Sequence, residues 1–257
     1  MAALDNDSDS ELELEEKQFT IGAHTFQVHV VGELPLETLF ALESKRDEIS
    51  GQRAWPGSLL LAAEISARPA LVADRAVVEL GAGAGLAGLA CAVNGARVVL
   101  TDLPENLPLL RRNATRNGWV QSLCGCEVSV EKLDWNTDAL PACDVLLGAD
   151  VCYHQDSVQA LCSLVDAAVA AGSTALLACE RHEPVAYAAL VAALRKHAVD
   201  VLLRDDGGAR RFEILLVTAH PLAAAPEAVA VDAGRPNWAA HWSHVRAAPD
   251  DGRLETA

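Results

Sequence analysis

The chain has 257 residues, 51% of them hydrophobic, which is enough for one large α/β domain or two small ones around an apolar core. The formal net charge of −16 disfavours a protein that follows nucleic-acid phosphates, because such a protein needs a basic stripe. The densest basic cluster, Arg111, Arg112 and Arg116, has the spacing of a solvated helix face. No stretch has the ~18 to 20 apolar residues of a membrane span, and the acidic first residues lack the apolar core of a signal peptide. We therefore expect neither nucleic acid nor a membrane as a partner.

The seven cysteines are an odd number, scattered through apolar segments, which indicates reduced thiols in a cytosolic or nuclear protein. Cys124 and Cys126 are too close together for a usual zinc pair, and no His or Cys partner lies at a ligand spacing. We therefore predict no metal site, and we expect a monomer that is cytoplasmic and can also be nuclear.

The composition divides the chain into three parts. Residues 1–17 predict a disordered acidic tail, and residues 222–257, which follow Pro221, form an Ala- and Pro-rich C-terminal tail. One domain is expected over residues 18–221, of which residues 18–50 are an N-terminal extension.

The elements before the core are short. Residues 19–31 alternate in hydrophobicity around a Gly22–Ala23 break and predict a β-hairpin. Residues 36–47 predict a short helix. A further helix is expected to begin at Pro56, because proline suits the first helical turn.

From residue 76 on, apolar strands alternate with helices, which indicates an α/β fold with a parallel sheet covered on both faces. A tight Asp-Asp-Gly-Gly turn at residues 205–208 joins the last two strands, so these two must pair antiparallel. The expected strands are 76–80, 97–101, 126–133, 143–149, 173–180, 199–204 and 211–219, and the expected helices are 85–95, 104–118, 157–171 and 184–197.

A glycine-rich segment, VVELGAGAGLAGLA at residues 77–90, connects the first core strand to its helix. Ligands of open α/β sheets bind at the carboxyl ends of the strands, where the strand order reverses, and glycines let the backbone approach a ligand closely. Gly83, Gly85 and Gly88 match the dinucleotide fingerprint G-x-G-x-x-G, but the match alone is weak and begins two residues late. Plain packing of helix on strand is the structural alternative.

Two acids decide between a dinucleotide and another nucleoside. Glu79 lies inside the first core strand, where a carboxylate would repel a pyrophosphate and favour a positive, phosphate-free tail. Asp102 ends the next strand, 21 residues after Gly81, where a carboxylate can accept both ribose hydroxyls. The joint pattern favours S-adenosyl-L-methionine over NAD.

The sequence resembles the seven-β-strand class I methyltransferases, and within them methyltransferase family 16, the protein-lysine methyltransferase-like group. The resemblance covers about residues 51–218 and is carried by AWPGSLLLA (54–62), VVELGAGAGLAGL (77–89), LDW (133–135) and DVLLGADVCY (144–153). The last is the most specific, because the group is marked by Asp-x-x-Tyr or Asp-x-x-Phe at the end of the fourth core strand. The resemblance implies a Rossmann-like seven-stranded sheet in the order 3-2-1-4-5-7-6, with strand 7 antiparallel and an N-terminal β-hairpin added.

The resemblance also assigns site residues. It implies cofactor contacts from Trp55, Gly81, Ala82, Gly83, Asp102, Trp135 and Ala149, to which the charge argument adds Glu79. Trp135 suits an aromatic contact with adenine, although a core tryptophan is the alternative. Trp55 could close over the methionine end of the cofactor. The structural alternative is that its ring is an apolar staple at the start of a helix.

Asp150 and Tyr153 are the predicted catalytic residues. Asp150 would attract and orient a lysine ammonium, and Tyr153 would form an aromatic or hydroxyl wall of the pocket. A helix N-cap and a packed ring are the structural alternatives. Glu180, Arg181 and His182 lie at the end of the fifth core strand and are candidates for substrate contact.

These residues predict an S-adenosylmethionine-dependent protein methyltransferase that N-methylates a lysine of a protein substrate. The alternatives are a methyltransferase for arginine, histidine or a small molecule, a non-catalytic cofactor-binding module, and an NAD-dependent dehydrogenase, which Glu79 and the late glycine match disfavour.

Overall fold

The computed structural model describes residues 13–32, 51–153, 155–181, 184–205 and 211–220. The predicted helix at 36–47, the turn at 205–208 beyond residue 205, and most of both predicted tails lie outside these residues. No described helix is both long and apolar enough to cross a bilayer.

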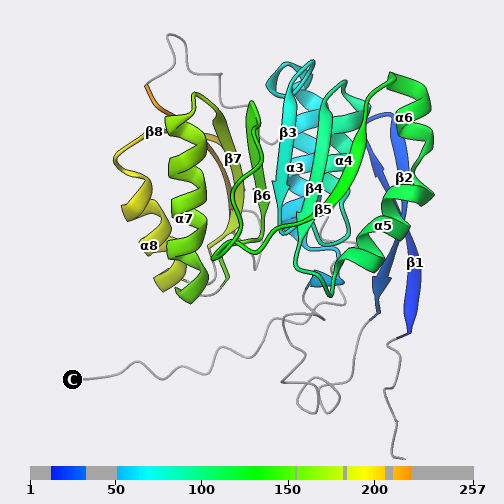
Figure 1. Cartoon of the computed structure of the whole chain (residues 1–257), viewed down its shortest axis with the longest axis horizontal. Helices are drawn as coiled ribbons and strands as arrows, with labels where there is room; N and C mark the ends of the chain where they lie inside the picture. The colour runs from blue at the N-terminus through cyan, green and yellow to red at the C-terminus, as the bar shows by residue number, and fades with distance from the viewer. Residues whose placement is uncertain (1–12, 33–50, 154, 182–183, 206–210, 221–257) are drawn as a thin grey trace, which may run out of the picture.

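The core is a seven-stranded sheet in the order β5-β4-β3-β6-β7-β9-β8, which is the predicted order 3-2-1-4-5-7-6 in the numbering of the core strands (Figure 1). β9 pairs antiparallel with both β7 and β8, and the other neighbouring pairs are parallel. The predicted fold is therefore confirmed. The strands are β3 Ala76–Leu80, β4 Arg97–Asp102, β5 Val128–Lys132, β6 Val145–Ala149, β7 Thr174–Glu180, β8 Ala198–Asp205 and β9 Phe212–Thr218.

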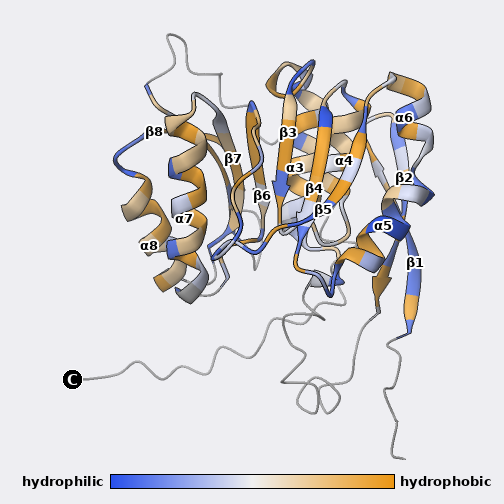
Figure 2. Ribbon diagram, viewed as in Figure 1, coloured by the Kyte–Doolittle hydropathy of each residue, from blue (hydrophilic) through white to orange (hydrophobic). Residues whose placement is uncertain are grey.

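Helices cover both faces of the sheet and enclose two hydrophobic clusters. Alternation along β3 sends Val77 into the cluster shared with α3 and α4, and Val78 into the cluster shared with α7 and α8. Figure 2 shows hydrophobic residues along the central strands. The helices are α3 Pro56–Ala67, α4 Leu86–Val93, α5 Leu107–Arg116, α6 Trp119–Cys124, α7 Gln155–Ala170 and α8 Pro184–Leu194, with a 3₁₀ turn, η2, at Pro69–Leu71.

The N-terminal hairpin is confirmed, but it is longer than predicted. It pairs β1 Leu14–Ile21 with β2 His24–Val31, and Leu14 lies opposite Val31. Residues 14–17, which the sequence placed in a disordered tail, are therefore strand. Their acidic composition conceals this, because a strand at the surface can pair through its main chain while its side chains face solvent.

The segment predicted as one helix at 104–118 is followed by a second, unpredicted helix, α6. α5 ends before Gly118, and α6 then packs Trp119 against the hairpin, with ring centroids 5.7 Å from both His24 and Phe26. Contact of this exposed aromatic ring with a distant segment supports a helix of only six residues.

Two asparagines on α5 hold the edge of β2. Asn113 Oδ1 accepts a hydrogen bond from the His29 N–H at 2.7 Å, and its amide donates to the His29 carbonyl at 3.0 Å. Asn117 does the same for Gln27, at 3.1 and 2.7 Å. Because these side-chain amides replace a neighbouring strand, the hairpin edge is satisfied without extending the sheet.

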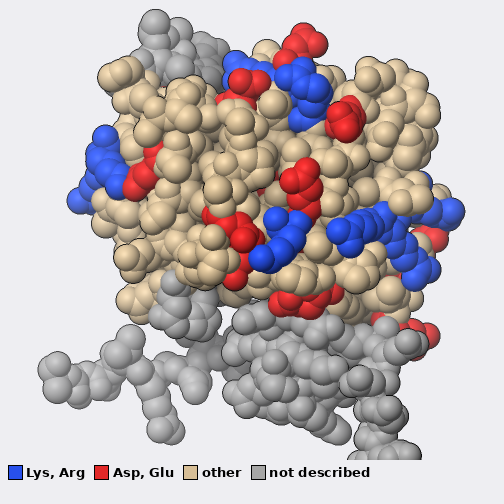
Figure 3. Space-filling model, in the orientation of Figure 1, with Lys and Arg blue, Asp and Glu red and all other residues tan. Residues whose placement is uncertain are grey.

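The basic cluster on α5 lies on the surface, as predicted. Arg111, Arg112 and Arg116 are exposed, and Arg116 Nη2 lies 3.2 Å from Glu16 Oε2 of β1. Figure 3 shows these basic side chains gathered over α5 beside acidic ones. They therefore form a solvated, partly neutralised helix face.

Candidate active site

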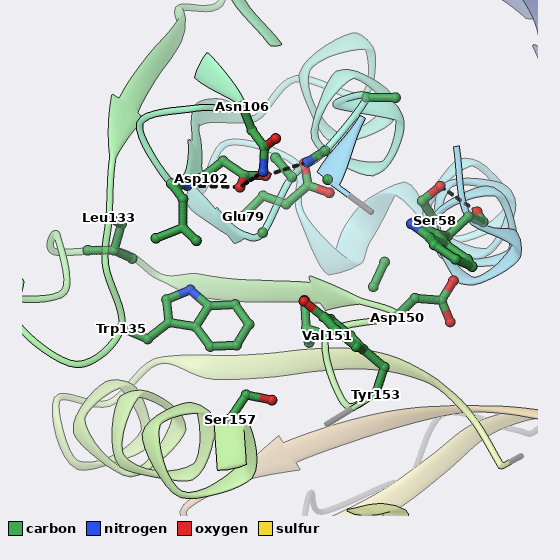
Figure 4. Close-up of a pocket in the computed structure, with 18 of the residues that line it drawn as sticks. Ser58, Glu79, Asp102, Asn106, Leu133, Trp135, Asp150, Val151, Tyr153 and Ser157 are labelled. Carbon is green, nitrogen blue, oxygen red and sulfur yellow. Dashed lines mark hydrogen bonds between the residues drawn. The ribbon is translucent and has the colours of Figure 1, made fainter. Parts of the chain in front are cut away.

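A cavity of about 270 Å³ opens at the carboxyl ends of the central strands β3, β4 and β6 (Figure 4). The strand order reverses at β3, so this is where an open α/β sheet binds ligands. The fold brings all the predicted site residues to its wall: Trp55, Glu79, Gly81, Ala82, Gly83, Asp102, Trp135, Ala149, Asp150 and Tyr153. In Figure 4, Asp102 and Trp135 lie on one side of the cavity, and Asp150 and Tyr153 on the other.

The turn after β3 leaves no room for side chains at two of its glycines. Gly81 and Gly83 have φ values of +57° and +54°, in the left-handed region that favours glycine. A Cβ on Gly81 would lie 3.3 Å from Cζ2 of Trp135, and a Cβ on Gly83 would lie 3.0 Å from the Gly51 carbonyl oxygen. The backbone of the turn is thus part of the cavity wall and accessible to a ligand.

The third glycine of the dinucleotide-like pattern has a packing role. A Cβ on Gly88 would lie 2.2 Å from Cδ2 of Leu100 and 2.6 Å from Oε2 of Glu79. Gly88 therefore lets α4 approach the sheet, and the G-x-G-x-x-G match is explained in part by helix–strand packing.

Glu79 is buried, and its Oε2 accepts a hydrogen bond from the Gly88 N–H at 2.8 Å. Burial raises the pKa of Glu79 from its ordinary value of 4.5 to about 8; the Gly88 N–H opposes this rise, and the nearby Asp102 adds to it. The carboxyl group is therefore mostly protonated at pH 7 in the ligand-free protein. The sequence-based prediction took Glu79 as a carboxylate beside a positively charged ligand, and such a ligand would favour release of this proton.

Asp102 is held by three donors. Its Oδ2 accepts from the Gly83 N–H, and its Oδ1 accepts from the Leu103 N–H and from the Asn106 amide, each at 2.8 Å. Burial raises the pKa of Asp102, and these hydrogen bonds oppose the rise. A carboxylate has about four acceptor positions, so Asp102 keeps one for a ligand hydroxyl. Asn106, a buried residue of the wall, was missed; its place four residues after Asp102, at the start of a helix, was the available signal.

Trp55 is the N-cap residue of α3, where it precedes Pro56 as predicted. Its carbonyl accepts hydrogen bonds from the Ser58 hydroxyl at 2.7 Å and from the Ser58 N–H at 3.1 Å. The guanidinium carbon of Arg53 lies 5.5 Å from the centre of the Trp55 ring. Arg53 and Ser58 also line the cavity, and neither was predicted from the sequence.

Asp150 connects β6 to α3. Its Oδ2 accepts a hydrogen bond from the Gly57 N–H at 2.5 Å, and its own N–H donates to the Ala178 carbonyl at 2.9 Å. Its φ of +55° is unusual for a residue other than glycine. The predicted alternative was a cap on a helix, and Asp150 does occupy a helix N-terminus, although it is that of α3. Tyr153, by contrast, is 44% exposed at the cavity.

The residues after β7 have a different environment. Arg181 Nη1 lies 3.5 Å from Glu213 Oε1, and its guanidinium lies over the Tyr187 ring at 5.9 Å. The Tyr187 hydroxyl donates to Glu213. Among the described residues of the cavity wall, neither Glu180 nor Arg181 appears, and His182 lies outside the described residues.

A sequence model of the family described as lysine methyltransferase matches residues 35–191, more than half of the chain. The chain belongs to this lysine methyltransferase family. The resemblance found in the sequence is therefore confirmed, and Asp150 and Tyr153 fall inside the matched region.

Several curated proteins are similar in sequence to part of this chain. Protein-lysine methyltransferase METTL21E of Mus musculus is 34% identical over 125 residues, 45% of this chain and 50% of the relative. Protein N-lysine methyltransferase METTL21A of Xenopus tropicalis is 33% identical over 105 residues, which are 40% of this chain and 48% of the relative. Histone-arginine methyltransferase METTL23 of Xenopus laevis is 36% identical over 111 residues, which are 40% of this chain and 45% of the relative. The chain thus spans about half the length of the curated relatives it matches.

Among solved structures, the 16S rRNA N2 G1207 methyltransferase RsmC of T. Thermophilus, in complex with AdoMet and guanosine, aligns with a TM-score of 0.52. The alignment covers 80% of this chain and 51% of that chain at 18% identity. This likeness shows the class I methyltransferase fold of the family member and nothing about its substrate.

Proposed function

We propose that the protein is an S-adenosylmethionine-dependent methyltransferase that N-methylates a lysine side chain of a protein substrate. One observation carries the proposal: a single cavity joins the glycine turn and Asp102, at one side, to Asp150 and Tyr153, at the other. Relatives named as protein-lysine methyltransferases support the same activity. A cytoplasmic location and a monomeric state stay predictions.

The residues present fit the cofactor. The glycine turn lines the cavity, where a Cβ at Gly81 or Gly83 would crowd the neighbouring wall, and Asp102 keeps an acceptor position for a ribose hydroxyl. The Trp135 ring and Leu133 provide an apolar surface for adenine. Ala149 offers the room of a small residue, and Trp55 lies at the start of α3 on the same wall.

When bound, S-adenosylmethionine supplies a methyl group on a sulfonium, which an amine takes by direct displacement. The lysine ammonium must first lose a proton to water, and with a free pKa of about 10.4 this costs roughly 4.6 kcal/mol at pH 7. The site would lower that cost by placing the amine against buried Val151 and the half-exposed ring of Tyr153, which shield it partly from water. Asp150 attracts and orients the ammonium before the proton leaves, and alignment supplies much of the remaining rate.

The experiment is transfer of labelled methyl from S-adenosylmethionine to fractionated lysate proteins, followed by mass spectrometry of the product. Methyl-lysine is the expected product. METTL23, a relative named as a histone-arginine methyltransferase, makes arginine the second candidate, and methyl-arginine would establish it instead. Absence of S-adenosylmethionine binding by calorimetry would refute both.

Asp150→Asn is the matched variant for the catalytic assignment. Its amide oxygen can still accept from the Gly57 N–H, and asparagine tolerates the left-handed conformation that Asp150 adopts. We expect methyl transfer to fall at least 100-fold while cofactor affinity and stability hold. Full activity of this variant would remove the charge of Asp150 from the mechanism.

A further inference from the structure

The charges around the cavity are unequal. Among the described residues of its wall, the acids are Glu79, Asp102, Asp134 and Asp150, and the one basic side chain is that of Arg53. Arg53 is therefore the one side chain of this described wall whose charge would attract a carboxylate, whereas ionised acids there would repel it.

The backbone around Arg53 is fixed against the glycine turn. The Val31 N–H, at the end of β2, donates to the Gln52 carbonyl at 2.8 Å. From the position of a Cβ on Gly83, the carbonyl oxygens of Gly51 and Arg53 lie at 3.0 and 3.6 Å. Arg53 therefore lies at the cavity wall beside the turn that follows β3, and a hydrogen bond from the hairpin holds the residue before it.

The side chain of Arg53 is oriented and reachable. Its guanidinium carbon lies 5.5 Å from the centre of the Trp55 ring, within the range of a cation–π contact. Arg53 is only partly buried, and both Arg53 and Trp55 are lining residues of the cavity. When a guanidinium stacks over a ring, the N–H groups at its edge stay available. Two of them can donate parallel hydrogen bonds to one carboxylate.

The cofactor of the proposed function carries such a group. Its methionine end bears a sulfonium, an ammonium and an α-carboxylate. Backbone carbonyls and carboxylates can serve the two positive groups, whereas the carboxylate needs a cation or N–H donors.

We propose that Arg53 recognises the α-carboxylate of the methionine end and makes the site selective for cofactors that carry it. The inference rests on the proposed use of S-adenosylmethionine, and it assigns a specificity-determining role to one residue of that site.

Decarboxylated S-adenosylmethionine tests this role, because it keeps the sulfonium and the amine and lacks only the carboxylate. Calorimetry would compare its affinity with that of S-adenosylmethionine for the wild type and for Arg53→Gln. We expect the wild type to prefer the carboxylated cofactor at least tenfold and Arg53→Gln to lose that preference. Arg53→Lys keeps the positive charge but loses the paired N–H donors, so it should keep part of the preference for the carboxylated cofactor. Arg112→Gln, an exposed change on α5, is the control and should behave as the wild type.

Three results would overturn the inference. If Arg53→Gln weakens both ligands equally, Arg53 acts by supporting Trp55. If it weakens neither, the carboxylate is bound by the backbone. If the wild type binds S-adenosylmethionine and its decarboxylated form equally well, no carboxylate recognition exists. Failure of the proposed use of S-adenosylmethionine is distinguishable, because the wild type would then bind neither ligand.

Discussion

The carboxylate of Asp150 accepts a hydrogen bond from the N–H of Gly57 at 2.5 Å, between residues 93 positions apart in the chain. Gly57 belongs to the first turn of α3, whose N-terminal N–H groups lack helical partners and favour a negative charge. A Cβ on Gly57 would lie 2.6 Å from Oδ2 of Asp150, so only glycine permits this approach. The contact joins the predicted substrate end of the cavity to the helix that carries Trp55.

Replacing Asp150 should separate its capping role from its charge. We expect Asp150→Ala to lower the free energy of unfolding by about 1–2 kcal/mol, because it removes the side-chain acceptor at the start of α3. Asp150→Asn should lower it by less than about 0.5 kcal/mol. Denaturant unfolding of both variants measures the difference, and equal losses would show that the cap contributes little.

Gly81→Ala should weaken cofactor binding beyond its cost in stability. The left-handed φ of +57° strains alanine by about 1–2 kcal/mol, and the new Cβ would lie against the Trp135 ring. Gly125→Ala is the matched control, because Gly125 has a φ of +65° and nothing lies within 4 Å of its Cβ position. Both variants should lose similar stability, and only Gly81→Ala should bind S-adenosylmethionine at least tenfold more weakly by calorimetry. Similar affinities for the two variants would contradict a cradle at Gly81.

Glu79 should make the stability of the ligand-free protein depend on pH. Its pKa is about 8 in the folded chain against an ordinary 4.5, so the folded state holds the proton more tightly than the unfolded state. The stabilisation is therefore complete below about pH 4.5 and is lost as pH rises through 8. Relative to Glu79→Gln, the wild type should lose a few kcal/mol of unfolding free energy between pH 5 and 8, since one pKa unit is about 1.4 kcal/mol. Denaturant unfolding at several pH values measures this loss. If the free energies of unfolding of the wild type and Glu79→Gln change in parallel with pH, Glu79 does not titrate in this range.

The same group should release a proton when the cofactor binds. A sulfonium and an ammonium near Glu79 favour its charged form and lower its pKa, so binding near pH 7 expels a proton and affinity rises with pH toward 8. Calorimetry in two buffers of different ionisation enthalpy counts the protons released. Glu79→Gln should abolish the release, and an unchanged count would place its source elsewhere.

Asn113 should support the glycine turn as well as the hairpin. Its amide donates to the Ala84 carbonyl at 3.2 Å in addition to its two bonds with His29, whereas Asn117 bonds to the hairpin and to its own helix. We expect Asn113→Ala and Asn117→Ala each to lose about 1–3 kcal/mol of stability, because each leaves buried backbone groups unpaired. Only Asn113→Ala should also raise the Kd for S-adenosylmethionine severalfold. A matching rise for Asn117→Ala would mean that the hairpin as a whole, and not the Ala84 contact, supports the turn.

Much of the fold could be predicted because its signals are local. Apolar runs, glycines and prolines placed the core strands and most helices within about three residues of their ends, and the Asp-x-x-Tyr and glycine segments pointed to the edge of the sheet where the cavity lies. The strand order came from the family resemblance, since periodicity alone does not say which strands are neighbours. β1 and α6 were misplaced or missed, because each depends on pairing or packing with a segment far away in the chain.

The sequence by itself determined that the glycine turn, Asp102 and Asp150 lie at one edge of the sheet, because the ends of parallel strands and the turns that follow them meet there. Only the tertiary structure decided their states. Whether Glu79 is charged depends on how completely the fold removes it from water. Whether Asp150 caps a helix depends on a hydrogen bond to Gly57, 93 positions away in the chain. Desolvation and long-range hydrogen bonds are properties of the packed chain, and no residue pattern within a segment specifies them.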